Sequence, residues 1–314
     1  APDRLQVVVA LDAVNGRASA ADLLAAGDPR VTVVTGDLPG GKAATLNAGV
    51  RAATGELLVF TDTHQRFHAD AIPRLVDALR DEPRVGIASG ALDLGASADA
   101  GRPRTLADHY WRYEKWLRER EAVVHSAVGV TGAIYVMRRA LWAPLPAGLI
   151  LDDVFTPMRL ALEGHRVGFV DAARAVDGRR FAPEQEYQRK VRTLTGVVQL
   201  CAWLPAVLVP GRNPIWIQFV FHKLLRLLTP YLALLFALAV AGRVLMAVVA
   251  LGPALALEAL VAAVAAAAVV ALAPPLRPLR RRFAGLFRWG VALQAAAVTA
   301  AMNGVRGRWD VWRR

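Results

Sequence analysis

The fold prediction starts from the stretch Gly40-Gly-Lys-Ala-Ala-Thr-Leu-Asn-Ala-Gly-Val-Arg-Ala-Ala-Thr-Gly-Glu-Leu-Leu-Val-Phe-Thr-Asp62. It combines a glycine loop, a helix over residues 42–53 and a short apolar strand over residues 56–60 that runs into an aspartate. Two further strands precede it, at residues 5–11 and 31–34. This β-α-β order predicts an α/β fold with a largely parallel sheet, whose ligands gather at the carboxyl ends of the strands.

The same alternation continues on both sides of this stretch. Helices are predicted at residues 19–26, 69–80, 106–124 and 153–163, and strands at residues 85–94, 133–137 and 167–170. A loop with two glycines, Gly129 and Gly132, precedes the strand at 133–137. We therefore expect residues 1–200 to form one catalytic α/β domain.

The last third of the chain is much more apolar. Residues 224–251 and 254–273 are each long enough to cross a bilayer, which needs about 20 apolar residues, and Gly252-Pro253 fits a turn between them. A third run, 289–303, would either span or lie in the interface. We expect interfacial helices at 201–228, two or three transmembrane helices at 229–305 and a basic tail at 306–314. A buried helical bundle is the alternative, but these runs lack a polar face.

The charge distribution supports a membrane location. The net charge of +12 admits nucleic-acid binding, attraction to anionic lipid, or cytoplasmic loops that obey the positive-inside rule. Many arginines flank the apolar runs, at residues 277–288 and 306–314, and no nucleic-acid-binding signature is present. We expect a multi-pass protein of the bacterial inner membrane with its catalytic domain in the cytosol and no nucleic-acid partner.

The cysteine content and the start of the chain give two further expectations. Cys201 is the single cysteine, so the chain has no internal disulfide and suits a reducing cytosol. The sequence opens at Ala1 without an initiator methionine or a signal peptide and enters a strand almost at once. We expect a truncated N-terminus.

Two segments could contact a nucleotide diphosphate. In Phe60-Thr-Asp62-Thr-His64, the carboxylate and the imidazole could both reach a divalent cation, Mg²⁺ or Mn²⁺, held by phosphate oxygens. An aspartate in this position also suits a turn or a helix cap. Lys42 starts a helix whose N-terminus suits a phosphate, with Asn47 further along, although an ordinary amphipathic helix explains the same pattern.

Two other segments could serve the acceptor and the proton transfer. Asp152 and Asp153 follow an apolar run, so one of them could act as a general base, and helix capping is a compatible alternative. Arg189 and Arg192 belong to a cationic cluster just before the apolar region. This cluster could hold a diphosphate or a sugar, or it could meet lipid headgroups.

Taken in order, these segments resemble family 2 glycosyltransferases of the membrane-bound, processive type, which include cellulose, chitin, hyaluronan and poly-N-acetylglucosamine synthases. Residues 41–49 are similar to the family's GK-x-x-x-LN-x-G segment, and residues 55–62 to the stretch that leads into its metal-binding D-x-D. Residues 130–139 are similar to its acceptor-side segment and residues 189–193 to its Q-R-x-R-W motif. The resemblance covers about residues 5–230 and implies a GT-A fold, with a mixed, mostly parallel sheet followed by interfacial and transmembrane helices.

The resemblance also implies roles for single residues. Asp12 would contact the base, and Lys42, Asn47, Asp62, Arg189 and Arg192 would bind the nucleotide-sugar, with Asp62 and His64 holding the divalent cation. Thr131 and Gly132 would bind the acceptor, and Asp153, next to Asp152, would be the general base of an inverting transfer. The donor would be a nucleotide-sugar, with UDP as the nucleotide.

Three departures from the family pattern keep alternatives open. His64 replaces the second aspartate of D-x-D, and Arg189 and Thr193 replace the glutamine and tryptophan of Q-R-x-R-W. The family's first strand would lie before Ala1. The resemblance as a whole still implies hexosyl transfer to a growing polysaccharide, with an accessory secretion subunit as a possible partner. A single transfer to a polyprenyl-phosphate or glycolipid acceptor is one alternative, and a catalytically silent membrane subunit is another.

Overall fold

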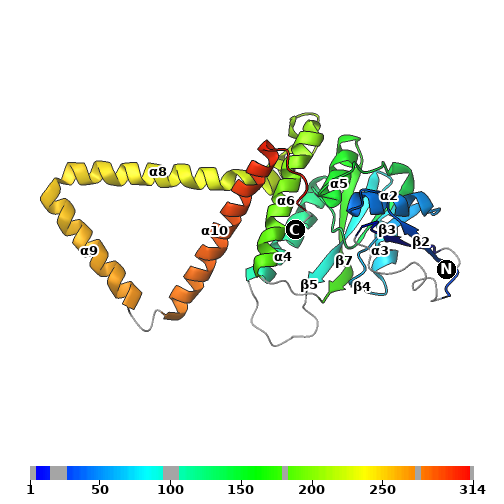
Figure 1. Ribbon diagram of the computed structural model, residues 1–314, viewed down its shortest axis with the longest axis horizontal. Helices are drawn as coiled ribbons and strands as arrows, with labels where there is room; N and C mark the ends of the chain where they lie inside the picture. Colours follow the sequence, from blue (N-terminus) through cyan, green and yellow to red (C-terminus); the bar gives the residue numbers. More distant parts are fainter. Residues whose placement is uncertain (1–4, 15–26, 95–105, 179–182, 273–276, 312–314) are drawn as a thin grey trace.

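The computed structural model describes residues 5–14, 27–94, 106–178, 183–272 and 277–311, and Figure 1 shows its arrangement. An α/β domain occupies one end of the molecule, and three long helices extend from it. The helix predicted at residues 19–26 lies outside the described residues.

The strands form two sheets. The first pairs β1 (Val7–Leu11) with β2 (Val31–Thr35) in parallel. The second has the order β3-β6-β5-β7-β4, formed by β3 (Leu57–Phe60), β6 (Tyr135–Arg138), β5 (Val85–Leu94), β7 (Arg166–Asp177) and β4 (Gln65–Phe67). The α/β class is therefore as predicted, and the strand β4 is an element that the sequence pattern did not reveal.

The expectation of a mostly parallel sheet is wrong. In the five-stranded sheet only β5 and β7 pair in parallel, whereas β6 runs antiparallel to both β3 and β5, and β4 antiparallel to β7. The chain leaves α4 (Leu106–Val124) and re-enters the sheet beside the middle of β5, where the amide of Gly90 donates to the carbonyl of Ile134 over 2.9 Å. From there it runs back along β5. β6 is therefore antiparallel to β5, although α4 lies between the two strands in the chain.

The two faces of this sheet carry separate clusters of apolar side chains. Ile87 and Met137 point to one face, and their neighbours Ala88 and Val136 point to the other, as the two-residue period of a strand requires. Helix α3 (Ala71–Asp81) covers the second face with buried residues four positions apart, which are Ala71, Leu75 and Leu79. On the first face, side chains of α2 (Lys42–Ala52) pack against Leu58 and Phe60.

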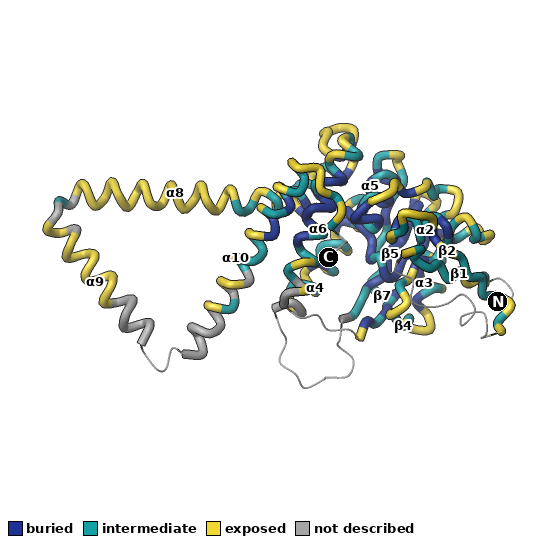
Figure 2. The backbone as a smooth tube through the Cα atoms, in the orientation of Figure 1, coloured by how far each residue is buried: buried dark blue, intermediate teal, exposed yellow. Residues whose placement is uncertain are grey.

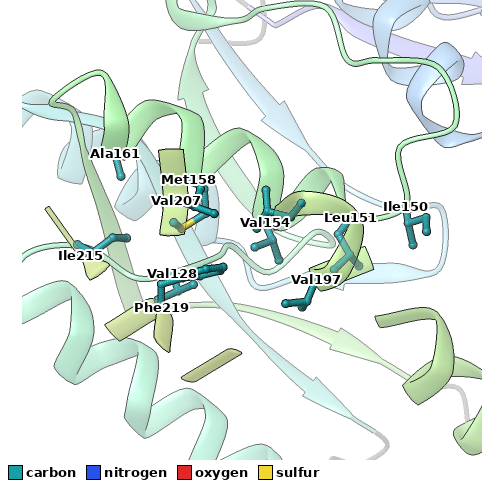
Figure 3. Close-up of a cluster of buried hydrophobic side chains, with 11 residues drawn as sticks. Val128, Ile150, Leu151, Val154, Met158, Ala161, Val197, Val207, Ile215 and Phe219 are labelled. Atoms are coloured by element: carbon teal, nitrogen blue, oxygen red, sulfur yellow. The ribbon is translucent and has the colours of Figure 1, made fainter. Parts of the chain in front are cut away.

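Helix α5 (Asp152–Leu162) joins the α/β domain to the helical region. Its buried residues Val154, Met158 and Ala161 pack with residues of α6 (Pro183–Trp203), of the turn η3 (Pro205–Leu208) and of α7 (Trp216–Phe219), as Figure 3 shows. The cluster includes Val197 and Phe219, which come from far along the chain. It fixes the start of α5, where Asp152 and Asp153 lie, against the helices that lead to the apolar region.

Three helices form the C-terminal region. A π-helical turn, η4 (Val220–Leu224), leads into α8 (Leu225–Leu251), followed by α9 (Pro253–Leu272) and α10 (Arg277–Val305). α10 returns to the α/β domain and packs on α6, where Ala296, Ala297 and Ala300 are buried. Residues 289–303, a run expected to span or to lie in the interface, form the second half of α10 and pack in part against α6.

The apolar surface of α8 is exposed. Figure 2 shows α8 exposed from Tyr231 onward, with Leu235 and Phe236 retaining 62% and 72% of their accessible surface. Among the described residues, one helix is long and apolar enough to cross a membrane, spanning Trp216–Ala250. The structure thus supports one of the spans expected from the sequence.

Candidate active site

Asp12 and the Gly40-Gly41 loop define one side of the site. The carboxylate of Asp12, at the end of β1, accepts hydrogen bonds from the amides of Val14 at 2.8 Å and of Gly41 at 2.5 Å. Gly40 and Gly41 have φ values of 83° and 92°, in the left-handed region that favours glycine. Asp12 therefore ties the loop after β1 to the start of α2, and its contact with a base stays a prediction.

Lys42 begins α2 and forms an ion pair with Asp152. Its Nζ lies 3.1 Å from Oδ1 of Asp152, which is only 8% exposed. Burial raises the pKa of Asp152 above its usual range, with Lys42 opposing burial and Asp153 adding to it. Burial also acts to lower the pKa of Lys42, but the charges of Asp152, Asp153 and Asp62 outweigh it and the pKa is raised. Lys42 is thus held as a cation.

Asp153 lies beside the acceptor-side loop. A Cβ placed on Gly132 would be 3.4 Å from Cβ of Asp153 and 3.5 Å from Nζ of Lys42, so these three residues meet. The amide of Val130 donates to the carbonyl of Asp153 over 2.8 Å, which holds the loop against the start of α5. A side chain at position 132 would fill the space in front of the carboxylate, so glycine keeps that space open.

Asp62 belongs to the same site although it comes from another strand. It follows β3, and its negative charge acts on Lys42, Tyr135 and Arg192. The charge of Asp153 acts on the same three groups. The two carboxylates predicted from distant segments therefore lie near the same two cations, Lys42 and Arg192, and the same phenol, Tyr135.

Arg192 on α6 completes the charged cluster. Burial lowers its pKa, and the nearby Asp153, Asp152 and Asp62 act against this, so the guanidinium stays charged. Arg189 lies one helical turn earlier and also acts on Arg192. The cluster thus has two cations from distant helices, Lys42 and Arg192, between its carboxylates.

Other residues support the site without facing it. The side-chain amide of Asn47 donates to the carbonyl of Leu145 at 2.9 Å, and its oxygen accepts from the amide of Leu145 at 2.8 Å, while its contact with a nucleotide-sugar stays a prediction. Asn47 therefore holds the segment that leads to Asp152. Tyr135, from β6, stacks on Phe60 with ring centroids 4.5 Å apart, beneath the carboxylates.

Thr131 is held by a residue that the sequence did not single out. Its hydroxyl donates to the carbonyl of Gly90 at 2.8 Å and accepts from Arg118 at 3.0 Å, and its amide donates to Ser89 at 2.7 Å. Thr131 is buried. No motif points to Arg118, because its position on α4 reaches the loop only through the fold.

The predicted metal ligands differ in exposure. His64 is exposed in the turn before β4, and Asp62 is half-buried. Within the described ranges, no group of three or more His, Cys, Asp and Glu side chains converges. A cation of the Mg²⁺ type is commonly bound by one or two carboxylates together with substrate phosphates, so Asp62 fits such a site when a diphosphate is present.

Gly196 offers a test of how α6 positions Asp152 and Asp153. A Cβ on Gly196 would overlap Leu151, the residue before the pair. We expect Gly196→Ala to lower the free energy of unfolding by about 1–3 kcal/mol and to reduce activity. Gly290→Ala, in α10 with nothing within 4 Å of the new methyl, is the matched control and should be neutral or stabilising. Thermal unfolding of both variants measures this, and equal effects would contradict the packing of α6 on Leu151.

Part of the chain matches a known family, and the chain is similar to solved structures. Residues 1–142 match the family model described as Glycosyl transferase family 2, and no curated protein sequence matches the chain. The mannosyltransferase PcManGT from Pyrobaculum calidifontis, solved with GDP-mannose and Mn²⁺, is 25% identical with a TM-score of 0.63, over 96% of this chain and 78% of that one. Glucosyl-3-phosphoglycerate synthase from Mycobacterium tuberculosis is 18% identical with a TM-score of 0.40, over 64% of this chain and 68% of that one. The chain is a nucleotide-sugar-dependent glycosyltransferase with a GT-A-like domain and a mixed sheet, and its residues 1–142 are similar to glycosyl transferase family 2.

Proposed function

We propose that this glycosyltransferase moves a hexose from a nucleoside-diphosphate sugar to a hydroxyl acceptor at the cytosolic face of the bacterial inner membrane, with inversion. The observation that carries the proposal is the meeting of Asp62, Asp153, Lys42 and Arg192 in one site. Asp153 faces the open space at Gly132, where an acceptor hydroxyl would lie. Exposed apolar side chains on α8 support membrane attachment of the chain.

In this proposal, each charged residue has one task. Asp153 takes the proton of the acceptor hydroxyl as the hydroxyl attacks the anomeric carbon. Lys42 and Arg192 stabilise the negative charge that develops on the leaving nucleoside diphosphate. Arg189 contributes a further positive charge. Asp152 is too buried to meet the acceptor and holds Lys42 in place. A divalent cation bound at Asp62 would supply further charge stabilisation of the diphosphate.

The donor test uses the full chain in detergent with a panel of UDP- and GDP-sugars. The resemblance implies UDP, whereas the similar mannosyltransferase was solved with GDP-mannose, so both nucleotides belong in the panel. We expect nucleotide release with one donor, loss of release on chelation by EDTA, and recovery with excess Mn²⁺ or Mg²⁺. Release that persists in EDTA would remove the cation from the proposal, and no release with any donor would contradict the proposed transfer.

Two acceptor classes remain in the proposal. A growing polysaccharide is what the resemblance implies, with an accessory secretion subunit as possible partner. Single transfer to a lipid-linked acceptor is favoured by Thr193, which stands where the family has its tryptophan. Its side chain is exposed and donates to the carbonyl of Arg189 over 2.9 Å, so it offers no ring for stacking on a sugar. Product length separates the two classes, because only a synthase makes a polymer.

A further inference from the structure

A buried network of charged side chains joins α4 to the beginning of α8. The ring of His222 lies between two carboxylates, with Nδ1 2.7 Å from Glu121 and Nε2 3.0 Å from Glu114. Glu114 also pairs with Arg226 at 2.5 Å, and Arg226 donates to the hydroxyl of Tyr110 at 2.9 Å. The network therefore holds α4 against the residues that lead into the apolar part of α8.

His222 lies in the π-helical turn η4, which is part of the long helix Trp216–Ala250. A π-helical turn is rare and often occurs at a functional site. His222 and Lys223 are neighbours in the chain and both are buried, whereas Phe221 keeps 67% of its accessible surface. The turn thus brings a buried histidine to α4 at the base of the candidate membrane span.

The acceptor loop, residues 126–134, connects α4 to β6 outside any helix or strand, and it is buried over residues 126–131. A buried segment of this kind needs hydrogen-bond partners for its amides. The partners outside the loop are backbone carbonyls and side chains: the amides of Ala127 and Val130 donate to the carbonyls of Val167 and Asp153, and those of Val128 and Thr131 donate to the side chains of Glu121 and Ser89. Side chains of α4 and β5 therefore help to set the path of the loop.

Two side chains of α4 hold this loop. Arg118 and Glu121 lie three positions apart, so they share one side of the helix. Glu121 uses one carboxylate oxygen for His222 and the other for the amide of Val128, over 3.2 Å. Arg118 donates to the hydroxyl of Thr131 over 3.0 Å. One side of α4 thus contacts both η4 and the acceptor loop.

These contacts lead to the space in front of Asp153. Thr131, which Arg118 holds, directly precedes Gly132, and a Cβ on Gly132 would lie 3.4 Å from Cβ of Asp153. Val130 donates its amide to the carbonyl of Asp153 over 2.8 Å. A displacement of about 1 Å at a reacting group can lower a rate about 10²-fold, so small shifts of the loop matter for transfer.

We propose that Arg118 and Glu121 are positioning residues for sugar transfer, which set the acceptor loop from the base of the candidate membrane span. Arg118 acts through Thr131, and Glu121 acts through a backbone amide of the loop. His222 acts on the loop through Glu121, without a contact of its own to the acceptor. The inference rests on the proposed function, because it concerns the acceptor side of that same site.

Hydrogen exchange of the full chain in detergent, read by mass spectrometry, tests whether η4 holds the loop. We expect His222→Leu to accelerate exchange of residues 126–134 at least about tenfold more than that of α3, which covers the other face of the sheet. Equal acceleration in both regions, or none in the loop, would overturn the proposal. Glu119→Gln, at an exposed position of α4, is the matched control and should leave exchange in both regions unchanged.

Kinetics test the positioning role of Arg118. Arg118→Gln removes the guanidinium that holds Thr131, so we expect the KM for the acceptor to rise at least about tenfold and the KM for the donor to stay within about twofold. Arg118→Lys keeps a donor for the hydroxyl and should recover part of the loss. Arg120→Gln, an exposed arginine on the same helix, is the matched control. Farnesyl phosphate is the acceptor probe for single transfer, and fragments of the polymer product are the probe for a synthase.

The failure of this proposal differs from the failure of the proposed function. If the unmodified chain releases no nucleotide from any donor, the transfer itself is contradicted and the positioning role falls with it. If the unmodified chain transfers sugar and Arg118→Gln keeps the same acceptor KM, the positioning role alone is overturned. Equal rises in the KM for the donor and for the acceptor would mean a general distortion of the site, which also overturns it.

Discussion

Asp153→Asn is expected to lower sugar transfer by about 10²- to 10⁴-fold and to leave the affinity for the nucleotide unchanged. The amide keeps the size of the side chain but cannot accept the proton of the acceptor hydroxyl at neutral pH. Lys42 stays paired with Asp152, so the cations that face the diphosphate keep their places. Initial rates with the donor identified from the panel, together with a nucleotide titration, measure the two effects.

The control for this variant is Asp81→Asn, an exposed carboxylate at the end of α3 and far along the chain from the site. It should behave as the unmodified chain does in both measurements. If Asp153→Asn weakens nucleotide binding as much as it slows transfer, Asp153 has a structural role. If transfer is unaffected, another group is the base.

His222→Leu is expected to destabilise the chain by about 3–5 kcal/mol, because it leaves buried carboxylates of Glu114 and Glu121 without the ring that lies between them. For a protein of this size, that corresponds to a fall of about 5–8 °C in the midpoint of thermal unfolding. Circular dichroism of the full chain in detergent, recorded during heating, measures this midpoint.

Glu119→Gln is the matched control, since Glu119 is an exposed acid on the same helix as the network. Its expected change is within about 0.5 kcal/mol. A double variant, His222→Leu with Glu121→Gln, should recover part of the loss because one uncompensated charge is removed. A midpoint for His222→Leu equal to that of the control would show that the network contributes nothing to stability.

Much of the α/β domain was predictable because local patterns determine its elements. The strands around Val7, Val31 and Leu57 are short β-branched or aliphatic runs, and the glycine loop before Lys42 predicts the start of the helix that follows. The order of motifs also predicted Asp62, Asp153 and Lys42 as site candidates, and the structure brings them together. Their roles in catalysis stay predictions until the variants are assayed.

Other features were not predictable because they depend on contacts between distant segments. The direction of β6 depends on where the chain leaves α4, and the short strand β4 forms only because Gln65, Arg66 and Phe67 find a partner in β7. A local pattern of apolar residues contains neither the direction of β6 nor the pairing partner of β4. The packing of α10 is another such case, because Ala296 and Ala300 are buried against residues of α6, about 100 positions earlier in the chain.

The sequence by itself determined the strand-helix order, the apolar C-terminal third and the ordered motifs of a glycosyltransferase, since each follows from residue type and spacing over a few positions. Only the tertiary structure decided that Asn47 binds the backbone of Leu145, that Arg118 holds Thr131, and that His222 lies between Glu114 and Glu121. A side chain's partner depends on which distant segment the fold places beside it. The spacing of residues along the chain does not tell which distant segment that will be.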